Sequence, residues 1–170
     1  MEELKTISET YKEQNQLLHQ QRDDYGKRGR RHLRNIKKLM AQHRCQTVLD
    51  YGCGKATLSK HLPCQNYDPC IPEYDIIPTP ADIVVCTDVL EHIEPGLLEN
   101  VLKHLKHLTQ KVGYFVIATR PDRSKTLPDG TNPHKIIEDR QWWARRLRNY
   151  FTILKMKGSS GESTFIVIPK

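Results

Sequence analysis

A short acidic segment with one histidine is the part of the sequence best suited to chemistry. Asp88, Glu91 and His92 directly follow the apolar run Ala81–Thr87. An unperturbed imidazole titrates close to neutral pH, so His92 can take a proton from an acceptor hydroxyl. In a plainer interpretation, Glu91 and His92 only cap and orient the helix that follows. On the first interpretation, the candidate catalytic residues are Asp88, His92 and His134, the last of which lies in a long loop further along the chain.

Two glycines one residue apart follow an earlier predicted strand. The run Thr47–Asp50 predicts a buried strand that closes on an acidic residue. Gly52 and Gly54 then let the backbone turn tightly and approach a ligand that a Cβ would keep away. Ala56 stands where a third small residue lets strand and helix pack closely. With a short helix expected at Thr57–His61, this stretch predicts a nucleotide-like ligand at a strand–helix turn.

Later segments extend this pattern. Asn66-Tyr67-Asp68-Pro69 places a carboxylate eighteen residues after Asp50, where a second strand should end. The run from Ala81 continues into Asp88-Val89-Leu90-Glu91-His92. Together these motifs, within about residues 47 to 120, resemble the class I S-adenosylmethionine-dependent methyltransferases, including compact bacterial and bacteriophage members. The D-x-L-E-H segment is similar to that of small-molecule O-methyltransferases such as those of ubiquinone synthesis.

The resemblance implies S-adenosylmethionine as cofactor, with S-adenosylhomocysteine as product. Gly52 and Gly54 would pass beneath the methionine part, and Asp50 would orient that loop or reach the amino group. Asp68 would accept from both ribose hydroxyls, although an Asp-Pro turn is the plainer interpretation. Asp88 would face the methyl group. The implied cofactor-binding residues are Asp50, Tyr51, Gly52, Cys53, Gly54, Asp68, Pro69, Thr87, Asp88 and Val89.

A metal site is a further interpretation of the acidic segment. Asp88, Glu91, His92 and the distant His134 resemble the E-x-x-E-H plus distal histidine of small-RNA 2′-O-methyltransferases, which bind a divalent ion. Asp88 stands where that pattern has Glu, and its shorter side chain has less reach. The expectation is therefore no metal, with these four residues as the ligands if one is used.

The other elements fit an α/β fold: a Rossmann-like, doubly wound, mostly parallel sheet with a C-terminal antiparallel hairpin. Periodicity predicts helices at 2–21, 30–43, 95–110 and 141–150, and strands at 83–87, 114–119, 151–156 and 163–168. Only thirteen residues separate Asp68 from Asp82, and four of them are prolines. Because proline fixes φ and removes a donor, we expect the third strand of the family to be lost or vestigial. Asp75 is the candidate in this linker for the acidic residue that contacts adenine.

Length and composition favour one methyltransferase domain over residues 1–170. Residues 1–44 would form a basic helical cover and residues 45–170 the Rossmann-like core. There is no run of eighteen apolar residues and no leader for export, so a cytoplasmic protein without a membrane span is expected. The five cysteines lack C-x-x-C spacing, which favours free thiols in a reducing compartment.

Positive charge is concentrated near the N-terminus. Of the net charge of +7, five units lie within residues 1–44. Lys27, Arg28, Arg30, Arg31 and Arg34 either form a solvated face or attract an anionic substrate.

Three function classes remain open. The first is methyl transfer to a small-molecule or glycan acceptor, most readily at oxygen, with the loop Arg120–His134 as an acceptor-site lid near Asn132 and His134. The second is methylation of RNA or DNA, with the basic N-terminal helix contacting phosphates. Against it, Thr87-Asp88-Val89-Leu90 lacks the [DNS]-P-P-[YFW] motif of amino-methylating DNA enzymes. A non-catalytic binding scaffold is the third.

Overall fold

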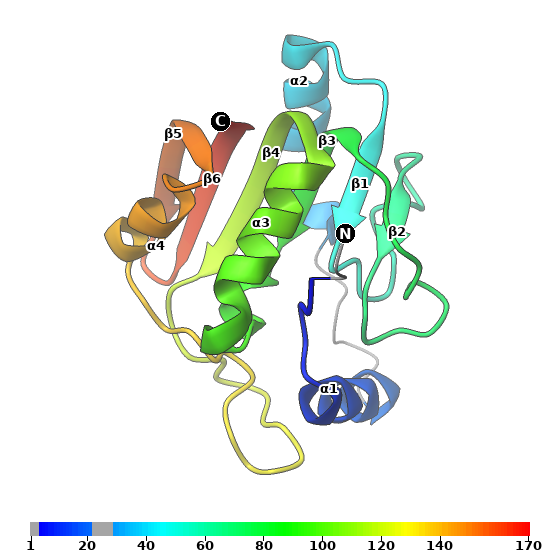
Figure 1. Cartoon of the computed structure of the whole chain (residues 1–170), viewed down its shortest axis with the longest axis vertical. Coiled ribbons are helices and arrows are strands. Elements are labelled where there is room, and N and C mark those ends of the chain that lie inside the picture. Colours follow the sequence, from blue (N-terminus) through cyan, green and yellow to red (C-terminus); the bar gives the residue numbers. More distant parts are fainter. Residues whose placement is uncertain (1–3, 22–28) are drawn as a thin grey trace.

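The computed structural model describes residues 4–21 and 29–170, and they form a six-stranded sheet with helices on both faces (Figure 1). The strand order is β2-β1-β3-β4-β6-β5. The first four strands in this order are parallel, β6 is antiparallel to β4, and β5 is antiparallel to β6. The strands are β1 (Val48–Tyr51), β2 (Gln65–Tyr67), β3 (Ala81–Thr87), β4 (Thr109–Ala118), β5 (Phe151–Ser159) and β6 (Glu162–Pro169). The predicted mostly parallel sheet with a closing antiparallel hairpin is confirmed.

Four α-helices and three single 3₁₀ turns accompany the sheet within the described ranges. The α-helices are α1 (Glu9–Gln21), α2 (Leu33–His43), α3 (Leu98–Leu108) and α4 (Arg140–Leu147). The 3₁₀ turns are η1 (Gly29–His32), η2 (Leu90–His92) and η3 (Pro95–Leu97). None of these helices has the length and apolar character needed to cross a bilayer.

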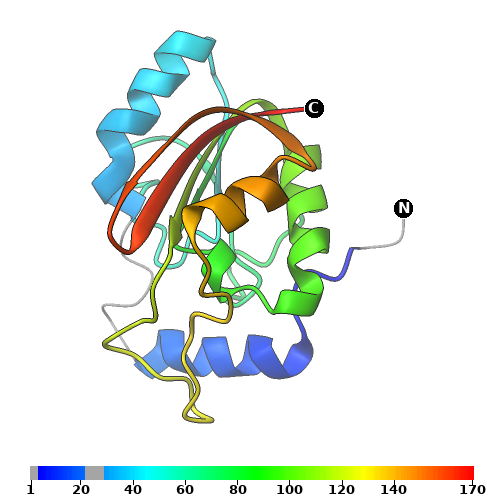
Figure 2. The same cartoon turned by 90° about the vertical axis from the view of Figure 1, so that its left-hand side faces the viewer.

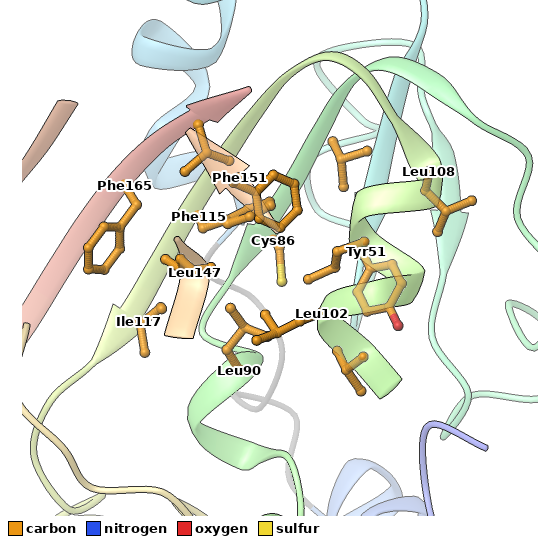
Figure 3. Close-up of a cluster of buried hydrophobic side chains, with 14 of the residues drawn as sticks. Tyr51, Cys86, Leu90, Leu102, Leu108, Phe115, Ile117, Leu147, Phe151 and Phe165 are labelled. Carbon is orange, nitrogen blue, oxygen red and sulfur yellow. The ribbon is translucent and has the colours of Figure 1, made fainter. Parts of the chain in front are cut away.

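Both faces of the sheet carry an apolar core. One cluster lies between the sheet and α3 and α4, and it contains Phe115 and Trp143. Figure 3 shows Cys86 and Phe115 within this cluster. The second cluster lies under α2, whose Ile36 and Leu39 pack on the other face. Because both faces are covered, every residue of β3 is buried, as expected for a central parallel strand.

Between β2 and β3, residues 68–80 form turns and no strand, which confirms the predicted loss. The Asp68 backbone N–H donates to the Tyr74 carbonyl at 3.1 Å, so the chain folds back on itself there. At the open edge of β2, the Gln65 amide accepts from the Thr79 backbone N–H at 3.1 Å and donates to the Thr79 carbonyl at 3.3 Å. The Gln65 side chain thus makes the two hydrogen bonds to Thr79 that the backbone of a neighbouring strand would otherwise make.

Two predicted helices differ from the structure. Thr57–His61 forms successive turns, in which the backbone N–H groups of His61 and Leu62 both donate to the Leu58 carbonyl. Just before it, Gly54 and Ala56 have φ values of 53° and 51°, a left-handed backbone that does not lead into a regular helix.

The N-terminal helix begins at Glu9 and not at residue 2. The Ser8 hydroxyl accepts from the Tyr11 backbone N–H at 3.2 Å, which caps the first turn. The second predicted helix, 30–43, starts with the 3₁₀ turn η1 and becomes α-helical at Leu33. Residues 2 and 3, and the stretch 22–28 between the two predicted helices, lie outside the described residues.

Candidate functional site

A hollow lies beyond the carboxyl ends of β1, β2 and β3, where the loops of parallel strands meet. The helix α1 lies across this end of the sheet (Figure 1). All ten residues predicted to bind the cofactor line the hollow, as do the three predicted catalytic residues. They are Asp50, Tyr51, Gly52, Cys53, Gly54, Asp68, Pro69, Thr87, Asp88, Val89, His92 and His134.

Gly52 is required where the β1 loop passes closest to the loop after β3. Its φ is +74°, and a Cβ at this position would lie 2.3 Å from Cγ2 of Val89. Its backbone N–H donates to the Tyr67 carbonyl at 2.7 Å, which ties the loop to the end of β2. Only glycine supplies both the backbone conformation and the space.

The Asp68 carboxylate is buried at the end of β2. Its Oδ2 accepts from the Gly54 backbone N–H at 3.0 Å, and its Oδ1 accepts from the Cys70 N–H at 2.9 Å. Burial raises the pKa of Asp68, and these two hydrogen bonds oppose that rise. Asp68 therefore holds the glycine loop in place, and each oxygen keeps a second lone pair for a ligand.

Asp50 is the second-last residue of β1, and its side chain is only 3% exposed. Burial, and secondarily the nearby negative charge of Asp68, raises the pKa of Asp50 to about 7. A carboxyl group with such a pKa is poised to ionise when a cationic ligand group enters the hollow.

Asp88 and Glu91 have different environments although they are three residues apart. Asp88 leaves β3 with a φ of 56°, and its backbone N–H donates to the Val116 carbonyl at 2.9 Å. Glu91 is fully buried outside the hollow, and its Oε1 accepts from the Ala118 backbone N–H at 3.0 Å. Burial, with the nearby Asp88 as a second cause, raises the pKa of Glu91 well above its ordinary range.

Glu91 also holds the long loop through its backbone. Its carbonyl accepts from the N–H groups of Lys135 and Ile136 at 2.7 and 3.0 Å. These bonds favour the interpretation in which Glu91 orients the surrounding chain.

His92 does not have the near-neutral pKa expected from its residue type. Burial, and secondarily His134, lowers the pKa of His92 to about 3, opposed in part by a hydrogen bond to the Pro133 backbone. The surrounding protein thus disfavours the imidazolium, and His92 as the catalytic base stays a prediction. A base with this pKa gains little from taking a proton at neutral pH.

His134 lies beside His92, with ring centroids 4.8 Å apart. Its Nδ1 is 2.6 Å from the Arg120 carbonyl oxygen. A carbonyl only accepts, so Nδ1 carries the hydrogen and Nε2 holds the lone pair of the neutral ring. That Nε2 lies 4.0 Å from Oδ2 of Asp122. Asn132 lies outside the hollow and accepts from the His134 backbone N–H, so it shapes the loop.

Three of the four residues predicted as metal ligands come together. Donor atoms of Glu91, His92 and His134 lie within 4.8 Å of one another, and Asp88 is not part of this group. Asp88 therefore does not take the place that the four-residue pattern assigned to it. Three nitrogen and oxygen donors are sufficient for a divalent ion, so the expectation of no metal stays an untested prediction.

Sequence reasoning did not identify the side chains that α1 contributes. Tyr11, Asn15 and His19 line the hollow at a spacing of four residues, which places them on one helical face. That spacing is visible in the sequence, but two of the three residues are polar and do not join the apolar stripe.

The helix α1 is docked mainly through the loop 119–139. Tyr11 and Leu18 pack with Leu127 in a small buried cluster, and the Tyr11 hydroxyl donates to the Pro133 carbonyl at 3.2 Å. At its other side, Lys12 forms an ion pair with Asp75 at 2.6 Å. Asp75 thus anchors α1 and does not line the hollow, contrary to its suggested place near adenine.

The basic N-terminal residues are only partly visible in the structure. Lys27 and Arg28, and the side chain of Arg30, lie outside what is described. Arg31 is exposed, with its Nη1 3.6 Å from Oε2 of Glu162, and Arg34 is exposed on α2. All five cysteines are free thiols, as expected.

A six-stranded α/β sheet with a ligand hollow at its carboxyl edge defines the class of protein. A family model described as a methyltransferase domain matches residues 17–158, and the chain belongs to this family. The predicted resemblance to class I methyltransferases is confirmed, while the likeness of the D-x-L-E-H segment to ubiquinone-synthesis enzymes stays a prediction. No curated protein sequence matches the chain significantly.

Solved structures share the fold at low sequence identity. One is the 1,6-didemethyltoxoflavin-N1-methyltransferase of Burkholderia thailandensis, with bound 1,6-didemethyltoxoflavin and S-adenosylhomocysteine. It is 13% identical with a TM-score of 0.67, covering 100% of this chain and 93% of that one. The DhpI complex with S-adenosylhomocysteine is 15% identical with a TM-score of 0.66, covering 96% and 98%. The mitomycin 7-O-methyltransferase MmcR is 10% identical with a TM-score of 0.56, covering 82% and 54%.

Proposed function

We propose that the chain transfers the methyl group of S-adenosylmethionine to a small-molecule acceptor, at oxygen. The observation that carries this proposal is the single hollow in which the ends of β1, β2 and β3 bring together Gly52, Asp50, Asp68 and Asp88. Related folds crystallised with S-adenosylhomocysteine support the same donor. Enclosure of the hollow by α1 and the loop 119–139 favours a small acceptor over a polymer.

In this proposal, the donor lies along the strand ends. Gly52 and Gly54 let the backbone approach the methionine part, and Asp50 contacts its amino group. Asp68 accepts from the ribose hydroxyls through the lone pairs that its backbone bonds leave. Asp88 faces the methyl group, where a carboxylate suits the cationic sulfonium.

Methyl transfer is an in-line displacement, so the protein must mainly align the two reactants. The acceptor oxygen forms a bond to the methyl carbon as the carbon–sulfur bond breaks, and the sulfonium becomes a neutral thioether. We assign the acceptor proton to Nε2 of His134, because Nδ1 is committed to the Arg120 carbonyl. Oδ2 of Asp122 lies 4.0 Å from this nitrogen. His92, with its pKa lowered to about 3, is the poorer base.

Calorimetry with S-adenosylhomocysteine tests donor binding. We expect saturable binding by the wild type and its loss in Asp68→Ala, because the variant lacks both the ribose acceptor and the bond that holds Gly54. Glu73→Ala is the matched control, since Glu73 is an exposed acid of the same linker outside the hollow. Absence of binding by the wild type would remove the proposed function.

A turnover screen with small-molecule extracts, measuring release of S-adenosylhomocysteine, tests the reaction. With an active extract fraction in hand, His134→Gln should lower the rate far more than His92→Gln. The reverse order would reassign the base to His92. Turnover that stops with a chelator and returns with a divalent ion would instead support the metal interpretation.

A further inference from the structure

A second hollow adjoins the first beyond the ends of β3 and β4. Three residues, Asp88, Asp122 and His134, line both hollows. The rest of its wall comes from the start of the 119–139 loop and from the turn between β5 and β6. These residues are Ala118, Thr119, Arg120, Arg123, Ser124, Ser160, Gly161 and Glu162. A molecule in this space would meet the donor hollow at Asp88 and His134.

Three acidic side chains, Asp88, Asp122 and Glu162, line the second hollow, and the last two have partners of their own. Oδ1 of Asp122 accepts from the backbone N–H groups of Ser124 and Lys125 at 2.8 and 3.1 Å. Burial raises the pKa of Asp122, but the hydrogen bonds from Ser124 and the nearby charge of Lys125 outweigh burial and keep this pKa below its ordinary value. Glu162 is paired with the Arg31 guanidinium at 3.6 Å. Asp122 and Glu162 are therefore already engaged by groups other than the two arginines of the hollow.

The two arginines of the hollow are not balanced in this way. Among the residues that the structure describes, neither Arg120 nor Arg123 has a carboxylate within ion-pair distance. The guanidinium of Arg120 makes one long hydrogen bond, from Nη1 to the Pro121 carbonyl at 3.5 Å. Two cations therefore face this space with unused donors.

Arg120 is held in place by the hairpin turn. The Thr119 backbone N–H donates to the Gly161 carbonyl at 3.0 Å, which fixes the turn beside the end of β4. A Cβ at Gly161, whose φ is +95°, would lie 2.5 Å from Cδ and 2.7 Å from Nε of Arg120. The side chain of Arg120 thus passes directly over this glycine and is half-buried there.

We infer that the second hollow binds an oxyanion group of the methyl acceptor, a phosphate or a carboxylate, through Arg120 and Arg123. Guanidinium groups suit both oxyanions because their paired N–H donors match two oxygens. The acceptor would extend from this anchor to the border shared with the donor hollow, which brings its reacting atom to His134. The inference rests on the proposed function, since it names the acceptor class of that site.

Inorganic phosphate is the first probe, added to protein saturated with S-adenosylhomocysteine at constant ionic strength and followed by amide NMR shifts. We expect saturable shifts confined to residues 119–124 and 160–162. Arg120→Gln and Arg123→Gln should each weaken phosphate about tenfold, the size of one lost charge-assisted hydrogen bond. Arg145→Gln, which removes an exposed arginine of α4 outside both hollows, should leave it unchanged.

The outcomes separate the two proposals. If S-adenosylhomocysteine binds but phosphate and acetate shifts stay linear, or persist in both variants, the oxyanion site is overturned and the proposed function stands. If S-adenosylhomocysteine itself does not bind, the proposed function fails first. If acetate and not phosphate gives saturable NMR shifts, and these shifts are lost in Arg120→Gln and Arg123→Gln, the site is supported and the oxyanion group is a carboxylate.

Discussion

Near the end of β1, the buried carboxyl group of Asp50 should couple ligand binding to pH. The pKa of Asp50 is about 7 in the folded chain, against an ordinary value of 3.8. Between these values the folded, ligand-free protein keeps a proton that the unfolded chain releases, so this group's contribution to stability falls as pH rises through that window. A cationic amino group beside Asp50 would favour the ionised form and expel the proton.

The affinity for S-adenosylhomocysteine should therefore rise with pH, by up to about tenfold per unit, and level off above about pH 7. Calorimetry between pH 5.5 and 7.5, in buffers of different ionisation heat, measures both the affinity and the released proton. Asp50→Asn has nothing to release, so its affinity should be independent of pH in this range. A wild type that binds equally at all these pH values, without proton release, would remove Asp50 from the amino-group site.

The contact of Gly52 with Val89 makes a second prediction at the scale of one residue. Gly52→Ala puts a methyl group 2.3 Å from Cγ2 of Val89 and forces alanine into a φ of +74°. Strain of both kinds should lower the free energy of unfolding by about 1–3 kcal/mol. S-adenosylhomocysteine binding should be lost as the loop moves.

Gly96→Ala is the control, because a Cβ there meets nothing within 4 Å and its φ is not positive. Urea unfolding should give an unchanged or slightly higher stability for this variant. Equal destabilisation by the two substitutions would contradict the special role of Gly52.

At the scale of elements, α1 covers the donor hollow through a small apolar contact. Leu18 is 4% exposed and packs with Tyr11 and Leu127, whereas its neighbour Leu17 is 44% exposed. The ion pair between Lys12 and Asp75 adds little, because exposed pairs contribute at most about 1 kcal/mol. Docking of α1 should therefore depend on Leu18.

Leu18→Ala should speed the dissociation of S-adenosylhomocysteine at least about tenfold, since losing a buried leucine costs about 2 kcal/mol or more. Stopped-flow displacement gives the rate of ligand dissociation. Leu17→Ala is the control, because it makes the same substitution at the neighbouring, exposed position of the same helix. The control should dissociate like the wild type. Similar rates for all three proteins would mean that α1 does not retain the ligand.

At the scale of the whole molecule, local sequence signals predicted the sheet and the donor hollow well. Apolar runs that are followed by Asp50 and Asp88 mark the ends of β1 and β3. The prolines after Asp68 exclude the additional strand that the family has between β2 and β3. These features depend on residues close together in the chain. The turn at Thr57–His61 was missed, because the left-handed backbone of Ala56 has no signal in its residue type.

Features built from distant segments could not be predicted in this way. The low pKa of His92 depends on burial against a loop more than forty residues away. The second hollow combines the end of β3, the start of the long loop and the last hairpin turn. Which face of α1 meets the hollow is decided by Leu127, which lies beyond the whole parallel part of the sheet in sequence.

The sheet is covered by helices on both faces, whereas α1 is held by few contacts, and this difference predicts which part of the molecule opens first. Figure 2 shows α1 below the lower end of the sheet. β3 is buried along its whole length, while α1 rests on one cluster of three buried residues and on polar contacts. In native-state hydrogen exchange, α1 amides should exchange through a local opening well before those of β3 and β4. S-adenosylhomocysteine at one hundred times its Kd should slow α1 exchange about a hundredfold, because the ligand must leave before α1 undocks. Exchange of α1 and β3 in one concerted step, or α1 exchange that ignores the ligand, would show that α1 is not a separate cover.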